Sequence, residues 1–136
     1  MNPIIKNVGA VVLGVIVGGF VNMGIIMLSG SIIPLPEGLD QTNMDSYNNS
    51  IHLLSNKHYI MPFLAHAIGT LIGAFLAAKI AATNKMLFAI VIGVFFLAGG
   101  IMASYMLSNS PNWFKAFDII LAYIPMAWIG GKLGMK

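Results

Sequence analysis

The chain lacks two residues that carry much of protein chemistry, cysteine and arginine. Without cysteine it has no disulfide, no thiolate nucleophile and no ligand for an iron–sulfur cluster. Without arginine it lacks the usual bidentate partner of phosphate and carboxylate groups. Charged residues make up only 8% of the 136 positions, against about a quarter in soluble domains. Because 58% of the residues are hydrophobic, this composition predicts a membrane protein.

Catalytic motifs are also missing. The sequence has no HExxH motif, no glycine-rich phosphate loop and no recognisable nucleophile–base motif. An intramembrane hydrolase that uses Asp118 and His66 stays open, but no motif names a substrate. All seven basic residues are lysines, and they are dispersed along the chain. The net charge of +3 therefore indicates membrane topology and no nucleic-acid partner.

Four apolar runs are long enough to cross a bilayer, which requires about 20 residues. They cover residues 7–29, 60–82, 86–107 and 113–131. A segment that spans lipid is either a helix or a strand of a closed barrel. Barrel strands are about half as long and alternate in polarity, which these runs do not. The sequence therefore predicts an all-α fold, a membrane four-helix bundle that forms a single transmembrane domain over residues 1–136.

The first two runs are joined by an insert, residues 30–59, which opens with the rigid turn PLPEG. Apolar residues then recur at spacings of three, four and three, at Met44, Tyr47, Ile51 and Leu54. Thr42 and Asp45 have the spacing of a capping box. This pattern predicts a short amphipathic helix near residues 43–56. It is too short to span, so we expect it on the membrane surface, in the first outer loop.

Lysines indicate the orientation of the chain. Five of them flank one side of the predicted bundle, at Lys6, Lys79, Lys85, Lys132 and Lys136. Lys57 and Lys115 alone flank the other side. The positive-inside rule then places both termini in the cytoplasm and the insert outside. We expect a multi-pass protein of the bacterial inner membrane, surrounded by the lipid bilayer, either as a homo-oligomer or within a larger membrane complex.

Each predicted helix carries one polar side chain at a similar depth. Counted from the outer ends at 1.5 Å per residue, they lie roughly 6–11 Å below the boundary, at Asn22, His66, Ser104 and Asp118. Polar groups at this depth are unfavourable unless they face the bundle interior and pair. We therefore predict an outward-facing polar pocket in which His66 pairs with Asp118.

Two further residues are candidates for the wall of this pocket. Thr70 lies one helical turn after His66. Tyr123 lies just before Pro125, which cannot donate a hydrogen bond to the carbonyl four residues earlier and predicts a kink in the last helix. The kink would place Tyr123 near the base of the pocket.

Methionines offer a possible metal site. Met23 and Met27 are four residues apart, as are Met102 and Met106, and all lie in the outer half. Thioethers suit monovalent copper, although methionine is equally a flexible core filler. With His66 and Asp118, these four methionines are the candidate metal ligands, and no cofactor is specified.

Two functions remain open. In one, the pocket binds or transports a proton, a cation or a small polar solute. In the other, the protein is an accessory or assembly subunit of a larger membrane complex, and the polar layer is purely structural.

The words VNMGIIMLSG, PLPEGLD, PFLAHAIGT and YIPMAWIGG occur in this order along the chain. In these segments the sequence resembles small four-span bacterial integral membrane proteins of uncharacterised function. The resemblance covers most of the chain and implies a four-span fold and a membrane location. It supplies no activity, so it assigns no catalytic residue.

The orientation is testable because the native chain contains no cysteine. We expect a membrane-impermeant thiol reagent added outside to label Ser50→Cys and to leave Thr83→Cys unlabelled in intact cells. Disrupting the membrane should make Thr83→Cys reactive. The reverse pattern of labelling would contradict the predicted topology.

Overall fold

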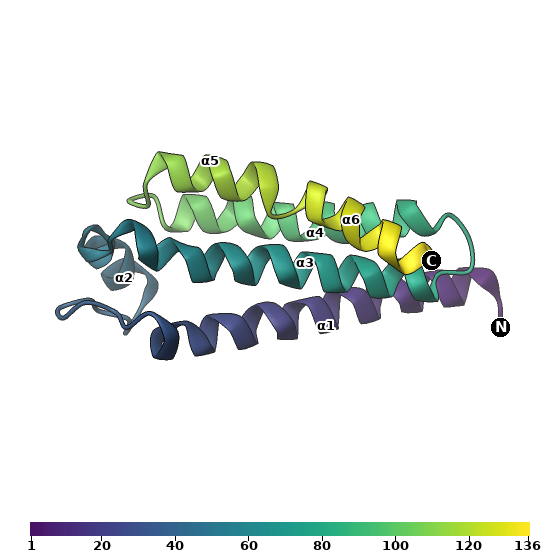
Figure 1. The fold of residues 1–136 in the computed structure, drawn as a ribbon, viewed down its shortest axis with the longest axis horizontal. Helices are drawn as coiled ribbons and strands as arrows, with labels where there is room; N and C mark the ends of the chain where they lie inside the picture. The colour runs from purple at the N-terminus through teal and green to yellow at the C-terminus, as the bar shows by residue number, and fades with distance from the viewer.

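The computed structural model describes all 136 residues, and its regular secondary structure consists of helices without strands. Its helices are α1 (Pro3–Ile32), α2 (Met44–Ser50), α3 (Ile60–Ile80), α4 (Lys85–Met106), α5 (Asn112–Leu121) and α6 (Ile124–Met135). Four segments are long and apolar enough to cross a membrane: α1, α3 with its preceding turn, α4, and α5 with α6. The all-α four-helix bundle predicted from the sequence is thus confirmed. Both termini lie at one end, the terminal end, and α2 lies at the other, the insert end (Figure 1).

The first span is longer than the predicted residues 7–29. It begins at Pro3, because the Asn2 side chain caps the helix by accepting a hydrogen bond from the Ile4 amide at 2.8 Å. Proline suits this first turn, where its missing N–H has no helical partner. The helix then continues to Ile32, so α1 is about 45 Å long at 1.5 Å per residue. That exceeds the hydrocarbon core of a bilayer, about 30 Å.

The surface helix is shorter than predicted and starts from a different cap. Residues 43–56 do not form one helix: α2 ends at Ser50, a 3-10 turn covers Ile51–Leu53, and Leu54 is extended. The Thr42 amide donates to the Asp40 carboxylate at 2.9 Å. This bond places Thr42 in a turn before the helix. Asn43 therefore caps α2, accepting a hydrogen bond from the Ser46 amide at 2.8 Å. The predicted capping box at Thr42 is wrong.

Glycines bring α3 close to two neighbours. A Cβ atom on Gly14 of α1 would lie 2.6 Å from the Gly73 carbonyl oxygen, and the reverse also holds. Gly18 and Gly69 face each other in the same way one turn nearer the insert end. On the other side of α3, the Leu71 carbonyl would block a Cβ on Gly130 of α6. The helix backbones are therefore in direct contact. In lipid there is no hydrophobic driving force between helices, so close packing of this kind stabilises their association.

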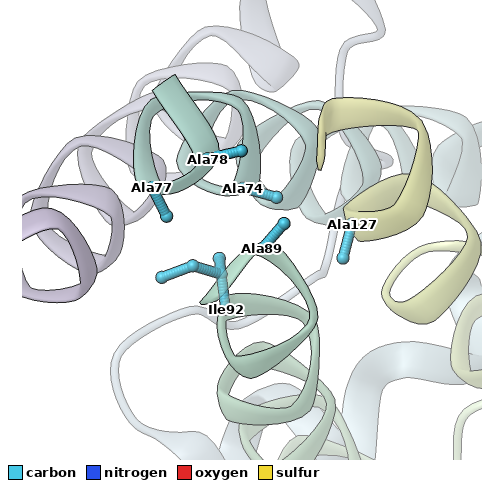
Figure 2. Packing of buried hydrophobic residues seen from close by; sticks show 6 residues of the cluster. All are labelled: Ala74, Ala77, Ala78, Ala89, Ile92 and Ala127. Carbon is cyan, nitrogen blue, oxygen red and sulfur yellow. The ribbon is translucent and has the colours of Figure 1, made fainter. Parts of the chain in front are cut away.

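Small side chains fill the terminal half of the bundle. The fully buried cluster comes from three helices, with Ala74, Ala77 and Ala78 on α3, Ala89 and Ile92 on α4, and Ala127 on α6. Figure 2 shows these side chains converging between the three helices. Alanine packs closely without losing side-chain entropy. This layer closes the bundle between the terminal end and the pocket described below.

Hydrogen bonds from two asparagines tie the ends of the bundle together. At the terminal end, Asn7 of α1 accepts from the Ala82 amide at 2.8 Å and donates to the Thr83 hydroxyl at 2.8 Å. It thereby attaches α1 to the turn between α3 and α4. At the insert end, Asn48 of α2 accepts from the Asn109 amide at 3.0 Å and donates to the Ser108 hydroxyl at 3.2 Å. The insert is therefore attached to the turn between α4 and α5.

The fourth span, predicted as residues 113–131, is interrupted. Helix α5 ends at Leu121 and α6 begins at Ile124, directly before Pro125. Pro125 cannot donate to the backbone of the preceding turn, which accounts for the break. The interruption sets α5 and α6 off as two segments (Figure 1). It places Ala122 and Tyr123 between two helix ends, and Tyr123 is nearly fully buried there.

The contact between α1 and α3 gives a stability test. We expect Gly14→Ala to lower the free energy of unfolding by about 1–3 kcal/mol, the usual effect of overpacking, because its Cβ would meet the Gly73 carbonyl. Gly9→Ala, on the same helix, is the control because a Cβ there meets nothing within 4 Å. Denaturation with SDS, followed by circular dichroism, measures both. Equal stability of the two variants would contradict the close helix contact.

Candidate functional site

A carboxylate and an imidazole meet between α3 and α5. The Nδ1 atom of His66 lies 2.8 and 3.0 Å from the two carboxylate oxygens of Asp118. The contact predicted from the sequence is therefore present. Asp118 is buried and so needs hydrogen-bond donors from within the protein. With the carboxylate as acceptor, Nδ1 carries the proton, and Nε2 on the far edge of the ring makes no hydrogen bond in the protein.

Tyr123 completes this group. Its hydroxyl donates to the second oxygen of Asp118 at 3.0 Å. Its ring also stacks against that of His66, with 5.8 Å between the centroids and 26° between the planes. Helix α4 makes room for the phenol at Gly100, where any Cβ would overlap the Tyr123 hydroxyl. The imidazole is thus fixed in position by a carboxylate on one edge and a phenol ring on its face.

A cavity of about 590 Å³ lies between this group and the insert. Its floor includes His66 and Asp118, and the insert contributes a set of side chains to its wall: Gln41, Tyr47, Ile51, Leu54 and His58. Burial raises the pKa of the Tyr47 phenol, which therefore stays protonated at neutral pH. Lys115 also lines the cavity, and its ammonium group donates to the Ser108 carbonyl at 2.7 Å.

A second cavity of about 270 Å³ adjoins the first and lies deeper in the bundle. The two share His66, Gly100 and Ala103 as lining residues. On every span, the lining residues of the smaller cavity are displaced toward the terminal end. On α1, for example, the larger cavity touches residues 26–30 and the smaller one touches Asn22. His66 therefore stands at the junction of an outer and an inner cavity.

Asn22 is unpaired in the inner cavity. Its Oδ1 atom is buried and has no hydrogen-bond partner, and the residue borders the same cavity as His66. Leaving a buried polar atom unpaired costs about 1–3 kcal/mol. Such groups in native structures call for an explanation, and a bound water, ion or ligand that donates a hydrogen bond would provide one.

The other two predicted pocket residues are satisfied within their own helices. Thr70 is buried beside the inner cavity, and its hydroxyl donates to the His66 carbonyl at 2.7 Å. Ser104 lines the outer cavity, and its hydroxyl donates to the Ile101 carbonyl at 2.7 Å. The six predicted pocket residues therefore all border one or both cavities.

The structure gives no support to a metal site. No three side chains of histidine, cysteine, aspartate or glutamate are close enough to hold an ion. The four methionines proposed as ligands are all exposed on the outside of the bundle, between 49% and 75%. Of these, only Met27 borders a cavity. His66 and Asp118 are joined to each other and lack a third ligand of this kind.

Sequence reasoning missed five residues that line the inner cavity: Gly69, Phe96, Gly99, Gly100 and Ala103. The adjacent glycines Gly99 and Gly100 were the available signal, because a glycine pair in an apolar helix often marks a close approach. The partner of Gly100 is a side chain that follows the break in the last span. Which side chain contacts Gly100 therefore depends on where the last span is interrupted, and the sequence pattern does not give that position.

Comparison of the chain with protein-family models, curated proteins and solved structures finds no match. The geometry of the site therefore carries the functional argument.

The phenol of Tyr123 gives a second stability test. We expect Tyr123→Phe to lower the free energy of unfolding by about 1.5–3 kcal/mol, because it removes a buried hydrogen bond to a carboxylate. Tyr105→Phe is the matched control, since that residue is 79% exposed and makes no side-chain hydrogen bond. Both are measured by SDS denaturation. Equal free energies of unfolding for Tyr123→Phe and Tyr105→Phe would mean that the hydrogen bond from the phenol to Asp118 does not stabilise the fold.

Proposed function

We propose that this chain is a bacterial inner-membrane protein that binds a small polar solute or a cation in the two adjoining cavities. The observation that carries the proposal is a pair of unpaired groups, one at the junction of the two cavities and one beside the inner cavity. His66 turns Nε2 away from the carboxylate that fixes Nδ1, and Asn22 has a buried amide oxygen without a partner. Groups fixed in position and left unsatisfied at a cavity are typical of binding sites.

Access to this site is from the insert end. The outer cavity reaches from the insert down to His66, whereas the alanine cluster fills the bundle on the other side. Five lysines lie toward the terminal end, which favours a cytoplasmic location for both termini. The pocket then opens toward the periplasm. Transport of the solute requires a second conformation in which the alanine layer separates.

The accessory role is the second candidate, and α1 favours it. Much of its surface is exposed, and four of its glycines have nothing within 4 Å of a Cβ position: Gly9, Gly19, Gly24 and Gly30. Exposed glycines allow a helix of another chain to approach closely in lipid. A purely structural polar layer, however, gives no role to the unpaired amide of Asn22.

Replacing Asn22 separates the two candidates. A panel of amines, carboxylates, amino acids and sugars is screened for thermal stabilisation of the purified protein. A solute at about 100 times its Kd stabilises the native state by about 2.7 kcal/mol. We expect Asn22→Leu to abolish this response and to be at least as stable as the wild type without solute, because it removes an unpaired polar atom.

Met23→Leu is the control, since the neighbouring residue is 55% exposed and borders neither cavity. It should keep the wild-type response to the solute. A wild-type protein that no solute stabilises, together with a less stable Asn22→Leu variant, would favour the accessory role and contradict the binding role.

A further inference from the structure

We infer that the ligand of the inner cavity carries an ammonium group, as ammonium itself or as a small primary amine. This rests on the proposed binding function and names the chemical class that the inner cavity selects. Four properties of the inner cavity favour such a ligand: the hydrogen atoms available in its wall, its charge, its aromatic rings and its size.

Three polar hydrogens of the cavity wall already make hydrogen bonds within the protein. The Thr70 hydroxyl donates to the His66 carbonyl, and the Tyr123 hydroxyl donates to Asp118. The Nδ1 proton of His66 is also directed at Asp118. None of these three hydrogens is left for a ligand, so a hydrogen bond from a ligand to Thr70 Oγ1, Tyr123 Oη or His66 Nε2 would have to use a lone pair of that atom. The buried oxygen of Asn22 beside the cavity also lacks a donor, so the side chains around the cavity favour a ligand that donates hydrogen bonds.

The charge of the wall favours a cation. With one proton on the imidazole, held at Nδ1, the His66–Asp118 pair carries a net charge of −1. No lysine lines the inner cavity, and Lys115 in the outer cavity is bonded to the Ser108 carbonyl. A buried carboxylate whose hydrogen bonds come from an imidazole and a phenol is further stabilised by a positive ligand. An anion would meet this negative charge, with the Asn22 amide group as its one side-chain donor.

Shape narrows the class of cation. Phe96 and Tyr123 line the inner cavity, and aromatic rings attract ammonium groups at about 6 Å or less. The rest of the wall consists largely of small apolar residues, Gly69, Gly99, Gly100 and Ala103. A volume of about 270 Å³ corresponds to about nine water molecules at roughly 30 Å³ each. There is room for an ammonium group with a short alkyl chain. A calcium ion would need six to eight oxygen ligands, which these residues do not supply.

Three probes of equal size test the inference: propylammonium chloride, propan-1-ol and sodium propionate. Binding to the full chain in detergent is measured by titration calorimetry at constant ionic strength. We expect saturable binding of propylammonium, at least tenfold tighter than either of the others. Asp118→Asn should weaken propylammonium binding at least tenfold. Asp45→Asn, which removes the same charge from exposed α2, should leave it unchanged.

Thr70→Val provides a second variant if Asp118→Asn does not fold. It keeps the shape of the side chain while removing one acceptor, and it should weaken propylammonium binding severalfold. Equal or tighter binding of propan-1-ol or propionate would overturn the ammonium inference and leave the binding function in place. Binding by none of these probes, with no response to the wider solute panel, would overturn both.

Discussion

A carboxylate inside a membrane-spanning helix has to find its hydrogen bonds within the protein, and Asp118 receives them from His66 and Tyr123. This requirement explains several features around it. The last span is interrupted beside Tyr123, so that its phenol reaches a residue five positions earlier. Helix α4 has glycine where the phenol would meet a Cβ. Together these features hold α3, α4 and the last span in one arrangement around a charged group.

The two halves of the bundle are built differently, and the site depends on the contrast. In the terminal half, alanine and glycine let the helices touch along their backbones, which leaves no space between them. Toward the insert end, the close glycine contacts between α1 and α3 stop at Gly18 and Gly69. Asn22, the next residue on that face of α1, borders the inner cavity. The inner cavity thus begins where the row of glycines ends. The close contact between α1 and α3 determines how deep in the bundle the cavity lies.

Much of the fold and part of the site could be predicted from the sequence. The four spans follow from the length of the apolar runs, and the pairing of His66 with Asp118 follows from the cost of burying either group in lipid. The start of α2 could not be predicted, because Thr42 and Asn43 are both good caps and Asp40 decides between them. The unpaired state of Asn22 was equally hidden. Only the packed structure shows that no donor reaches its oxygen.

The position of the proton on His66 connects the architecture to the chemistry of the inner cavity. Asp118 holds one proton at Nδ1, and this leaves Nε2 as an acceptor facing the cavity. A second proton at Nε2 would neutralise the charge of the pair and replace that acceptor with a donor. The ammonium ligand that we infer would compete with this second proton for the same lone pair. His66 borders both cavities, so a ligand that exchanges through the outer cavity would pass the group that the proton also occupies. Such a ligand and the proton would then exclude each other at one residue, with no need for a second binding site.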